Sequence, residues 1–131
     1  MRCGGDDLEF CEDRAIFLQI ADRIENDIMR GILLCDERAP STNELAAIYG
    51  INPNTAAKSL TVLTNDGILY KKRGVGMFVA PGAKEAILAK RREKFSAEYI
   101  APMVREAKLL GLDANTLASM IDAAYKEEKD E

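Results

Sequence analysis

The sequence that decides the fold is RAPSTNELAAIYGINPNTAAKSLTVLTNDGILYKKRGVGMFV, residues 38–79. Its first part contains a capping box, because the Ser41 hydroxyl can accept from the Glu44 amide while the Glu44 side chain reaches back to the Ser41 amide. This pattern predicts a short helix over residues 42–49. The apolar side chains expected to face the core from this helix are Leu45 and Ile48.

A second helix is predicted over residues 53–65, after a turn at Gly50. Asn52 is a good N-cap, and Pro53 suits the first helical position, where no amide hydrogen bond is lost. The pair Asp66-Gly67 ends the helix. Its buried stripe is expected to comprise Ala56, Leu60 and Leu63.

A β-hairpin is predicted next, with a strand over residues 68–73, a glycine-bearing tip over 74–76 and a returning strand over 77–79. Another helix precedes all these elements, over residues 14–30, and Gly31 is its expected C-terminal cap. Its apolar stripe comprises Phe17, Ile20, Ala21, Ile24 and Ile28. The order helix, helix, tight turn, helix, hairpin is typical of a winged helix-turn-helix.

Two further helical segments are expected after the hairpin. Pro102 should kink or split the first of them at about Ala101, because proline lacks the amide hydrogen. Gly111 ends this segment, and Asp113 caps the last helix. Apolar side chains at helical spacing are expected to pair two copies of the chain, namely Phe95, Tyr99, Met103, Ala107, Leu110, Leu117, Met120, Ile121 and Tyr125.

The predicted fold class is therefore mainly α with a small β-hairpin, in a chain of 131 residues. Its parts are expected to be a flexible lead-in over 1–13, a winged helix-turn-helix over 14–80 and a two-helix dimerisation tail over 83–131. No apolar window is long enough to cross a membrane, and the acidic N-terminus lacks the apolar region of a secretory signal. These features favour a cytoplasmic protein.

Candidate catalytic and metal-binding groups are scarce. The chain has no His, which removes the commonest general base and metal ligand. Its three cysteines, Cys3, Cys11 and Cys35, are odd in number and form no Cys-x-x-Cys pair, so neither a disulfide framework nor a structural zinc site is expected. We therefore expect no enzymatic activity, no metal and no cofactor.

The net charge of −4 conceals a basic segment. Residues 38–73 hold five basic and two acidic side chains, a local charge of +3, whereas residues 1–13 sum to −4. Attraction to phosphate depends on the charge at the contact surface, because salt at 0.1 M screens charges beyond about 10 Å. The charge distribution is compatible with a nucleic-acid partner.

The start of the 53–65 helix is typical of a helix that contacts bases. Asn54 could pair with an adenine edge, Thr55 could contact a phosphate or a thymine methyl group, and Lys58 follows one turn later. Asn54, Lys58 and Thr61 share the face opposite the apolar stripe. The alternative interpretation is that this segment only caps the helix and that Lys58 is a solvated charge.

Two flanking elements carry further candidate contacts to DNA. In the loop before the 42–49 helix, Arg38 is expected to pair with a phosphate. Arg73 at the hairpin tip could enter a minor groove, since a narrow groove concentrates negative potential. Consecutive strand residues point to opposite faces, so at most two of the three cations at 71–73 meet one surface. The remaining candidates are Ser41, Thr42, Asn43, Lys72, Gly74 and Gly76.

Taken in order, these motifs resemble the GntR family of bacterial regulators. The matching stretches, between about residues 14 and 80, are Gln19-Ile20-Ala21, Gly31, Pro40-Ser41, Glu44-Leu45-Ala46, Gly50-Ile51-Asn52-Pro53-Asn54-Thr55, Asp66-Gly67-Ile68-Leu69-Tyr70 and Arg73-Gly74-Val75-Gly76-Met77-Phe78-Val79. The Asn-Pro-Asn-Thr motif with a short helical tail is similar to the YtrA subfamily, whose members are often encoded beside transporter genes. The resemblance implies DNA contacts by Arg38, Ser41, Thr42, Asn43, Asn52, Asn54, Thr55, Lys58, Arg73, Gly74 and Gly76.

The sequence departs from the family pattern in two segments. Cys35-Asp36-Glu37 stands where the family usually has Pro-Gly-Asp, so this turn is expected to differ. Pro53 and Ala57 occupy positions that are often arginine, which shifts the expected phosphate contacts to Lys58 and the hairpin.

The short helical segment over residues 83–131 indicates how the protein is expected to assemble. Two helices cannot enclose a metabolite pocket alone, but they can bury their apolar faces against a second chain. Such a dimer would present two recognition helices about one DNA turn apart to a palindromic operator. The sequence therefore predicts a homodimeric repressor of such an operator, with a transporter operon as a candidate target and no effector identified. The alternative is a winged-helix adaptor that binds protein rather than DNA, which the polar face of the 53–65 helix disfavours.

Overall fold

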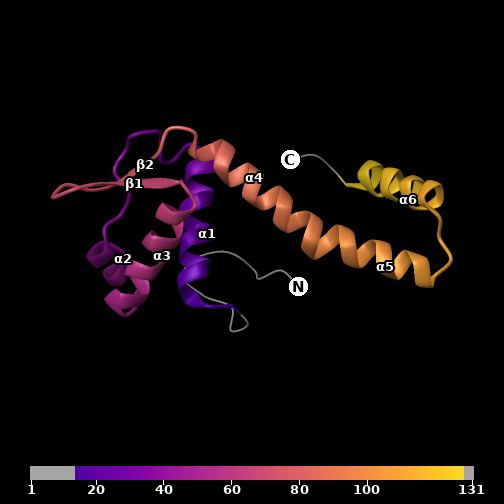
Figure 1. The fold of residues 1–131 in the computed structure, drawn as a ribbon, viewed down its shortest axis with the longest axis horizontal. Coiled ribbons are helices and arrows are strands. Elements are labelled where there is room, and N and C mark those ends of the chain that lie inside the picture. Colours follow the sequence, from indigo (N-terminus) through magenta and orange to yellow (C-terminus); the bar gives the residue numbers. More distant parts are fainter. Residues whose placement is uncertain (1–13, 129–131) are drawn as a thin grey trace. The chain divides into compact units, whose positions relative to one another are not determined.

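A computed structural model describes residues 14–128 of the chain (Figure 1). Its elements are helices and one two-stranded antiparallel sheet, which is the predicted fold class. The chain divides into two compact units, whose described parts are residues 14–89 and residues 90–128. The expected lead-in over residues 1–13 lies outside the described residues.

Three helices and the sheet make up the first unit. Helices α1 (Ile16–Met29), α2 (Thr42–Tyr49) and α3 (Pro53–Asn65) follow one another in the predicted order. Helix α3 packs against α1, against α2 and against the first strand of the hairpin (Figure 1). Since these elements cover its apolar side, the opposite face of α3 is left to solvent.

Local hydrogen bonds explain where α2 and α3 begin. Ser41 Oγ accepts from the Glu44 amide at 3.1 Å, and Glu44 Oε1 accepts from the Ser41 amide at 2.8 Å, so the predicted capping box is confirmed. Asn52 Oδ1 accepts from the Asn54 amide at 2.7 Å, which confirms the predicted N-cap of α3. Between the two helices, Gly50 adopts the left-handed φ of 63° that ends α2.

The capping box predicts an acid-sensitive stability. Hydrogen bonds with the Ser41 backbone and hydroxyl hold the pKa of the Glu44 carboxyl below its ordinary value. The folded state therefore favours the carboxylate, whose stabilising effect is present at neutral pH and is lost as the pH falls below about 4. Glu44→Gln keeps a side-chain acceptor without the charge. We expect it to melt at a lower temperature than the unchanged protein at neutral pH, with no difference at about pH 3. Thermal unfolding followed by circular dichroism measures this, and a difference that is equal at both pH values would contradict it.

The sheet consists of β1 (Leu69–Lys72) and β2 (Gly76–Val79), which pair antiparallel with Leu69 opposite Val79. The first strand is shorter than the predicted 68–73. Gly76, which was expected in the tip, instead belongs to β2, where it lies opposite Lys72.

The loop before α2 pairs with the free edge of β2. The Ala39 amide donates to Met77 O at 2.8 Å, and the Val79 amide donates to Glu37 O at 2.9 Å. Between these two bonds, Arg38 lies opposite Phe78 in an antiparallel bridge. The hairpin therefore fixes the backbone of the segment 36–39.

The core of the first unit is mostly aliphatic. Its largest fully buried apolar side chains are Ile20, Ile28, Leu45, Leu63, Ile68, Leu69, Ile87 and Val79. The stripe predicted for α3, Ala56, Leu60 and Leu63, is buried throughout. The prediction for Ile48 was wrong, because this side chain is 54% exposed. The packing on α2 covers Leu45 but leaves Ile48, three residues later, at the surface, where it lines a groove with Pro40 and Ala47.

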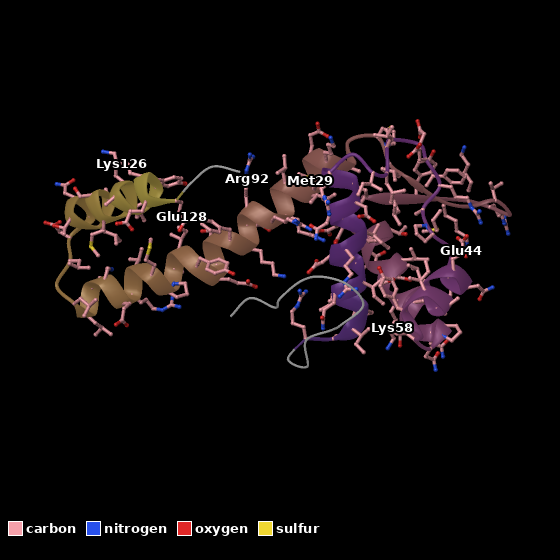
Figure 2. The ribbon with its side chains drawn as sticks, turned by 180° about the vertical axis from the view of Figure 1, so that it is seen from behind. Met29, Glu44, Lys58, Arg92, Lys126 and Glu128 are labelled. Atoms are coloured by element: carbon pink, nitrogen blue, oxygen red, sulfur yellow. The ribbon has the colours of Figure 1, made fainter. Side chains whose placement is uncertain are left out.

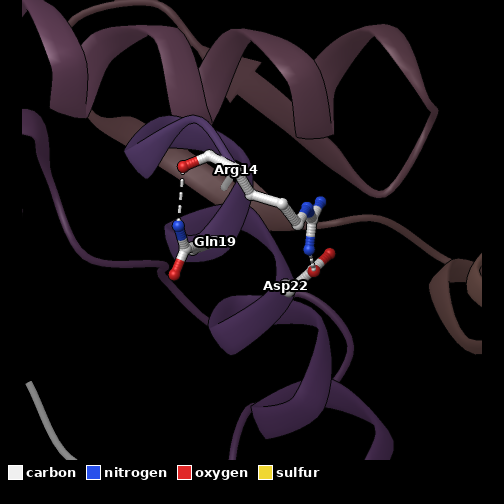
Figure 3. A network of polar contacts seen from close by, with 3 residues as sticks. All are labelled: Arg14, Gln19 and Asp22. Atoms are coloured by element: carbon white, nitrogen blue, oxygen red, sulfur yellow. Dashed lines mark hydrogen bonds and ion pairs between the residues drawn. The ribbon is translucent and has the colours of Figure 1, made fainter. Parts of the chain in front are cut away.

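A polar network holds the start of α1 (Figure 3). The Arg14 guanidinium donates to Asp22 Oδ2 at 2.7 Å, and Gln19 Nε2 donates to Arg14 O at 2.8 Å. Helix α1 has no side-chain N-cap hydrogen bond, since Ala15 occupies the cap position. The Arg14 side chain folds back along the helix instead, and its charge is paired with a carboxylate.

The second unit is helical. Helix α4 (Ala83–Phe95) leads through a π-helical turn, η1 (Ser96–Ile100), into α5 (Ala101–Leu109), and α6 (Ala114–Glu127) follows. The chain stays helical from Ala83 to Leu109, and the change from α to π hydrogen bonding lies where Pro102 predicts an interruption. Proline has no amide hydrogen and its ring crowds the carbonyl four residues earlier, so the regular hydrogen bonding cannot pass through this point.

The division between the units falls inside α4, after Ala89. The physical reason is that Ala83 and Ile87 are buried in the core of the first unit. Helix α6 begins as predicted, with Asp113 Oδ1 accepting from the Thr116 amide at 2.8 Å.

Membrane and metal-binding features were sought within residues 14–128. No helix in this range combines the length and the apolar character needed to cross a membrane. In the same range, no three cysteine or carboxylate side chains gather as a metal site would require. Cys35 is an exposed free thiol, whereas Cys3 and Cys11 lie outside the described residues.

Candidate nucleic-acid interface

A groove with a volume of about 510 Å³ opens on the first unit between α2, α3 and the hairpin. Two cations, Arg38 and Lys71, line it, and none of the described residues that line it is acidic. Its other polar lining side chains are Ser41, Thr42, Asn43, Thr61, Thr64 and Asn65. Positive charge combined with hydroxyl and amide groups suits such a surface to phosphate oxygens.

The residues selected from the sequence at the start of α2 all lie on this groove. Ser41, Thr42 and Asn43 line it from the first turn of the helix, and Arg38 lines it from the preceding loop. Ser41 is also the N-cap of α2, so it serves both the cap and the groove wall.

The residues selected on α3 lie beside the groove. Asn54 and Lys58 are exposed, Thr55 is partly buried, and Asn52 caps the helix. Lys58 Nζ lies 5.8 Å from the ring centroid of the half-buried Phe17, away from the hairpin (Figure 2). The first turns of α3 thus present polar side chains next to the groove rather than within it.

The second half of α3 supplies three further groove residues, Thr61, Thr64 and Asn65. Thr61 was expected on the exposed polar face of the helix, and the other two were not. Thr61 Oγ1 donates to Ala57 O at 3.0 Å and Thr64 Oγ1 donates to Leu60 O at 2.8 Å, so each hydroxyl can only accept from a ligand. The helical period could also have identified Asn65, because it follows Thr61 by four residues on the same exposed face.

The hairpin separates its two lysines. Lys71 lines the groove, whereas Lys72 Nζ lies 4.6 Å from the ring centroid of Phe78, which stacks on Tyr70. Lys71 therefore lies in the groove, although it was not among the residues expected to contact DNA. Lys72, which was expected to contact DNA, lies outside the groove. The alternation of side chains along a strand was the signal that distinguishes them, since Met77, opposite Lys71, also lines the groove.

The tip of the hairpin is open to solvent. Arg73 and Gly74 are both exposed there. Lys72 O accepts from the Val75 amide at 2.9 Å, and Gly74 within this turn has a left-handed φ of 75°. Arg73 thus stands at the exposed end of the hairpin, where a contact to a minor groove was expected.

The Arg38 side chain lies against Gly76 of β2. A Cβ atom at position 76 would lie 3.1 Å from Arg38 Nε, which is tighter than ordinary van der Waals contact. The φ of Gly76 is 142°, a value that residues with side chains rarely adopt. The glycine therefore leaves room for the guanidinium beside the hairpin.

Comparisons with known proteins lead to one family. The family model described as "Bacterial regulatory proteins, gntR family" matches residues 17–79. The uncharacterized HTH-type transcriptional regulator YhcF of Bacillus subtilis is 34% identical over 106 residues, which cover 81% of this chain and 86% of that protein. The HTH-type transcriptional repressor YtrA of the same organism is 27% identical, with 81% of each chain covered.

A solved structure leads to the same family. A transcriptional regulator of the GntR family from Bacteroides thetaiotaomicron is 36% identical and has a TM-score of 0.76, with 88% of this chain and 100% of that chain covered. A transcriptional regulator from Oenococcus oeni, 21% identical, shares the fold with a TM-score of 0.73 over 89% of this chain and 96% of that one. This chain therefore belongs to the GntR family of bacterial regulatory proteins, as a YtrA-like DNA-binding transcription regulator and not an enzyme.

Proposed function

We propose that this protein is a homodimeric repressor that binds a palindromic operator. The observation that carries the proposal is the groove of the first unit, which has Arg38 and Lys71 on its walls and no acidic side chain among its described lining residues. Phosphate contacts on this groove would orient α3 on the duplex. The relative YtrA is named a repressor, which favours repression, and a regulator of bacterial DNA would act in the cytoplasm.

Two kinds of contact are proposed for the first unit. Arg38 and Lys71 would neutralise DNA phosphates. Further hydrogen bonds to the sugar-phosphate backbone of the DNA would come from Ser41, Thr42, Asn43 and Asn52. Base edges would be contacted by Asn54 and Thr55, with Lys58 one turn further along α3. At the hairpin, the proposed contacts to the minor groove come from Arg73, Gly74 and Gly76.

The second unit supports the proposed dimer. Among its described residues, only Ala107 is a buried apolar side chain. The large apolar side chains that it exposes are Phe95, Tyr99, Val104, Leu109, Leu110, Met120, Ile121 and Tyr125. A soluble monomer rarely leaves so much apolar surface in water, and the same surface of a second chain would cover it in a symmetric pair. The expected pairing residues Met103 and Leu117 are partly buried within the unit.

The direct test is binding of the full chain to the DNA upstream of its own gene, measured by fluorescence anisotropy at increasing salt. We expect a palindromic fragment to bind about 1,000-fold more tightly than random DNA, with affinity falling linearly on logarithmic axes as salt rises. The control is the same fragment with one half-site scrambled. Equal affinity for random DNA would contradict the proposal. Transporter operons are further candidate targets, because the sequence resembles the YtrA subfamily, whose members are often encoded beside transporter genes.

A further inference from the structure

Asp36 has an unusual backbone conformation in the loop before α2. Its φ is 67°, and among the described residues it is the only one other than glycine with a positive φ. This left-handed conformation is unfavourable for a residue with a Cβ atom, although aspartate tolerates it better than most. The chain therefore keeps a side chain at a position where glycine would fit without strain.

The carboxylate of Asp36 reaches the hairpin. Asp36 Oδ1 accepts a hydrogen bond of 2.7 Å from the Tyr70 hydroxyl of β1, and the Asp36 amide donates to Val79 O of β2 at 2.9 Å. One residue thus contacts both strands. Glycine at position 36 could make the bond to Val79 but not the bond to Tyr70.

Tyr70 is well placed to hold this bond. Its ring stacks on Phe78, with 5.9 Å between the ring centroids, so the hydroxyl is directed by packing as well as by its acceptor. The bond to the Asp36 carboxylate raises the pKa of the Tyr70 hydroxyl further above neutrality, as expected of a phenol that donates to a carboxylate.

Arg38 follows Asp36 by two residues. Its backbone lies opposite Phe78, the residue on which Tyr70 stacks, and its side chain lies against Gly76. The direction in which the guanidinium enters the groove therefore depends on how the loop is seated on the hairpin.

We propose that Tyr70 and Asp36 are positioning residues for Arg38. Their hydrogen bond holds the segment 36–39 on the edge of β2 and thereby presents the guanidinium to a DNA phosphate. This inference rests on the proposed phosphate contact of Arg38. Tyr70, which does not line the groove, thereby has a share in the affinity for DNA.

The test uses Tyr70→Phe, which removes the hydroxyl and keeps the ring that stacks on Phe78. We expect affinity for DNA to fall about 3- to 10-fold, the effect of losing one hydrogen bond. The slope of affinity against salt should also become shallower, because a phosphate contact is weakened. In an Arg38→Ala background, Tyr70→Phe should have no further effect on affinity.

Two substitutions of Asp36 complete the test. Asp36→Gly suits the backbone but loses the bond, so it should reproduce the affinity of Tyr70→Phe. Asp36→Asn keeps an acceptor and tolerates the same φ, so it should restore most of the affinity. Thermal unfolding of each variant separates a change in positioning from a loss of the fold.

The possible outcomes distinguish the positioning role of Tyr70 from the phosphate contact of Arg38. If Tyr70→Phe leaves the affinity unchanged while Arg38→Ala lowers it, the positioning role is wrong and the phosphate contact stands. If Tyr70→Phe lowers the affinity equally with and without Arg38, its effect does not pass through Arg38. If Arg38→Ala itself has no effect, the proposed phosphate contact fails, and the positioning role fails with it.

Discussion

Replacement of Met120 by aspartate is expected to convert the proposed dimer into a monomer and to lower operator affinity by about 100-fold or more. Met120 is 51% exposed on the apolar side of α6. In a monomer the new carboxylate stays in water and leaves the helix intact. In a dimer it would be buried against an apolar face, which is costly for an unpaired charge. Sedimentation equilibrium measures the first effect, and fluorescence anisotropy on the palindromic operator measures the second.

The loss of affinity follows from the geometry of two half-sites. When one subunit of a dimer is bound, the second half-site is reached at a high effective concentration, and a monomer loses this advantage. A DNA fragment with a single half-site should therefore bind Met120→Asp about as tightly as it binds the unchanged protein.

Ser119→Asp is the matched control. Ser119 precedes Met120 on α6 and is exposed on the opposite side of the helix, the side that carries the ion pair between Asp122 and Lys126. This variant carries the same added charge and should remain dimeric with full affinity. Pairing through α6 is contradicted if Met120→Asp remains dimeric or if the unchanged protein is itself a monomer. The contribution of the dimer to operator binding is contradicted if Met120→Asp is monomeric and still binds the operator as tightly as the unchanged protein.

The features that could be predicted from the sequence depend on contacts between near neighbours. Ser41 and Glu44 are three residues apart, and Asn52 bonds to the amide two residues later, so the starts of α2 and α3 follow from local chemistry alone. The interruption at Pro102 is local in the same sense, because it arises from one missing amide hydrogen.

The features that escaped prediction depend on the tertiary structure. The exposure of Ile48 depends on which elements cover α2, and a short helix does not specify this by its own pattern. The bond between Tyr70 and Asp36 joins residues 34 positions apart, and nothing near either residue in the sequence indicates it. The placement of Lys71 in the groove is a different case, since strand alternation would have identified it once the buried side of the hairpin was assigned.

Asn54→Ala is expected to reduce the preference for the correct base pair at its contact position by about 5- to 150-fold. This factor corresponds to about 1–3 kcal/mol, the discrimination that a bidentate contact with a base provides. The side chain is exposed, and the N-cap bond of Asn52 goes to the backbone amide of residue 54, so alanine preserves the start of the helix. Anisotropy competition with single-base-pair variants of the operator measures the effect. The comparison variant is Arg38→Ala, which should weaken binding to every fragment by a similar factor and reduce the salt slope by about 1. The assignment of base contacts to Asn54 is contradicted if its variant weakens all fragments equally while Arg38→Ala alters the base preference.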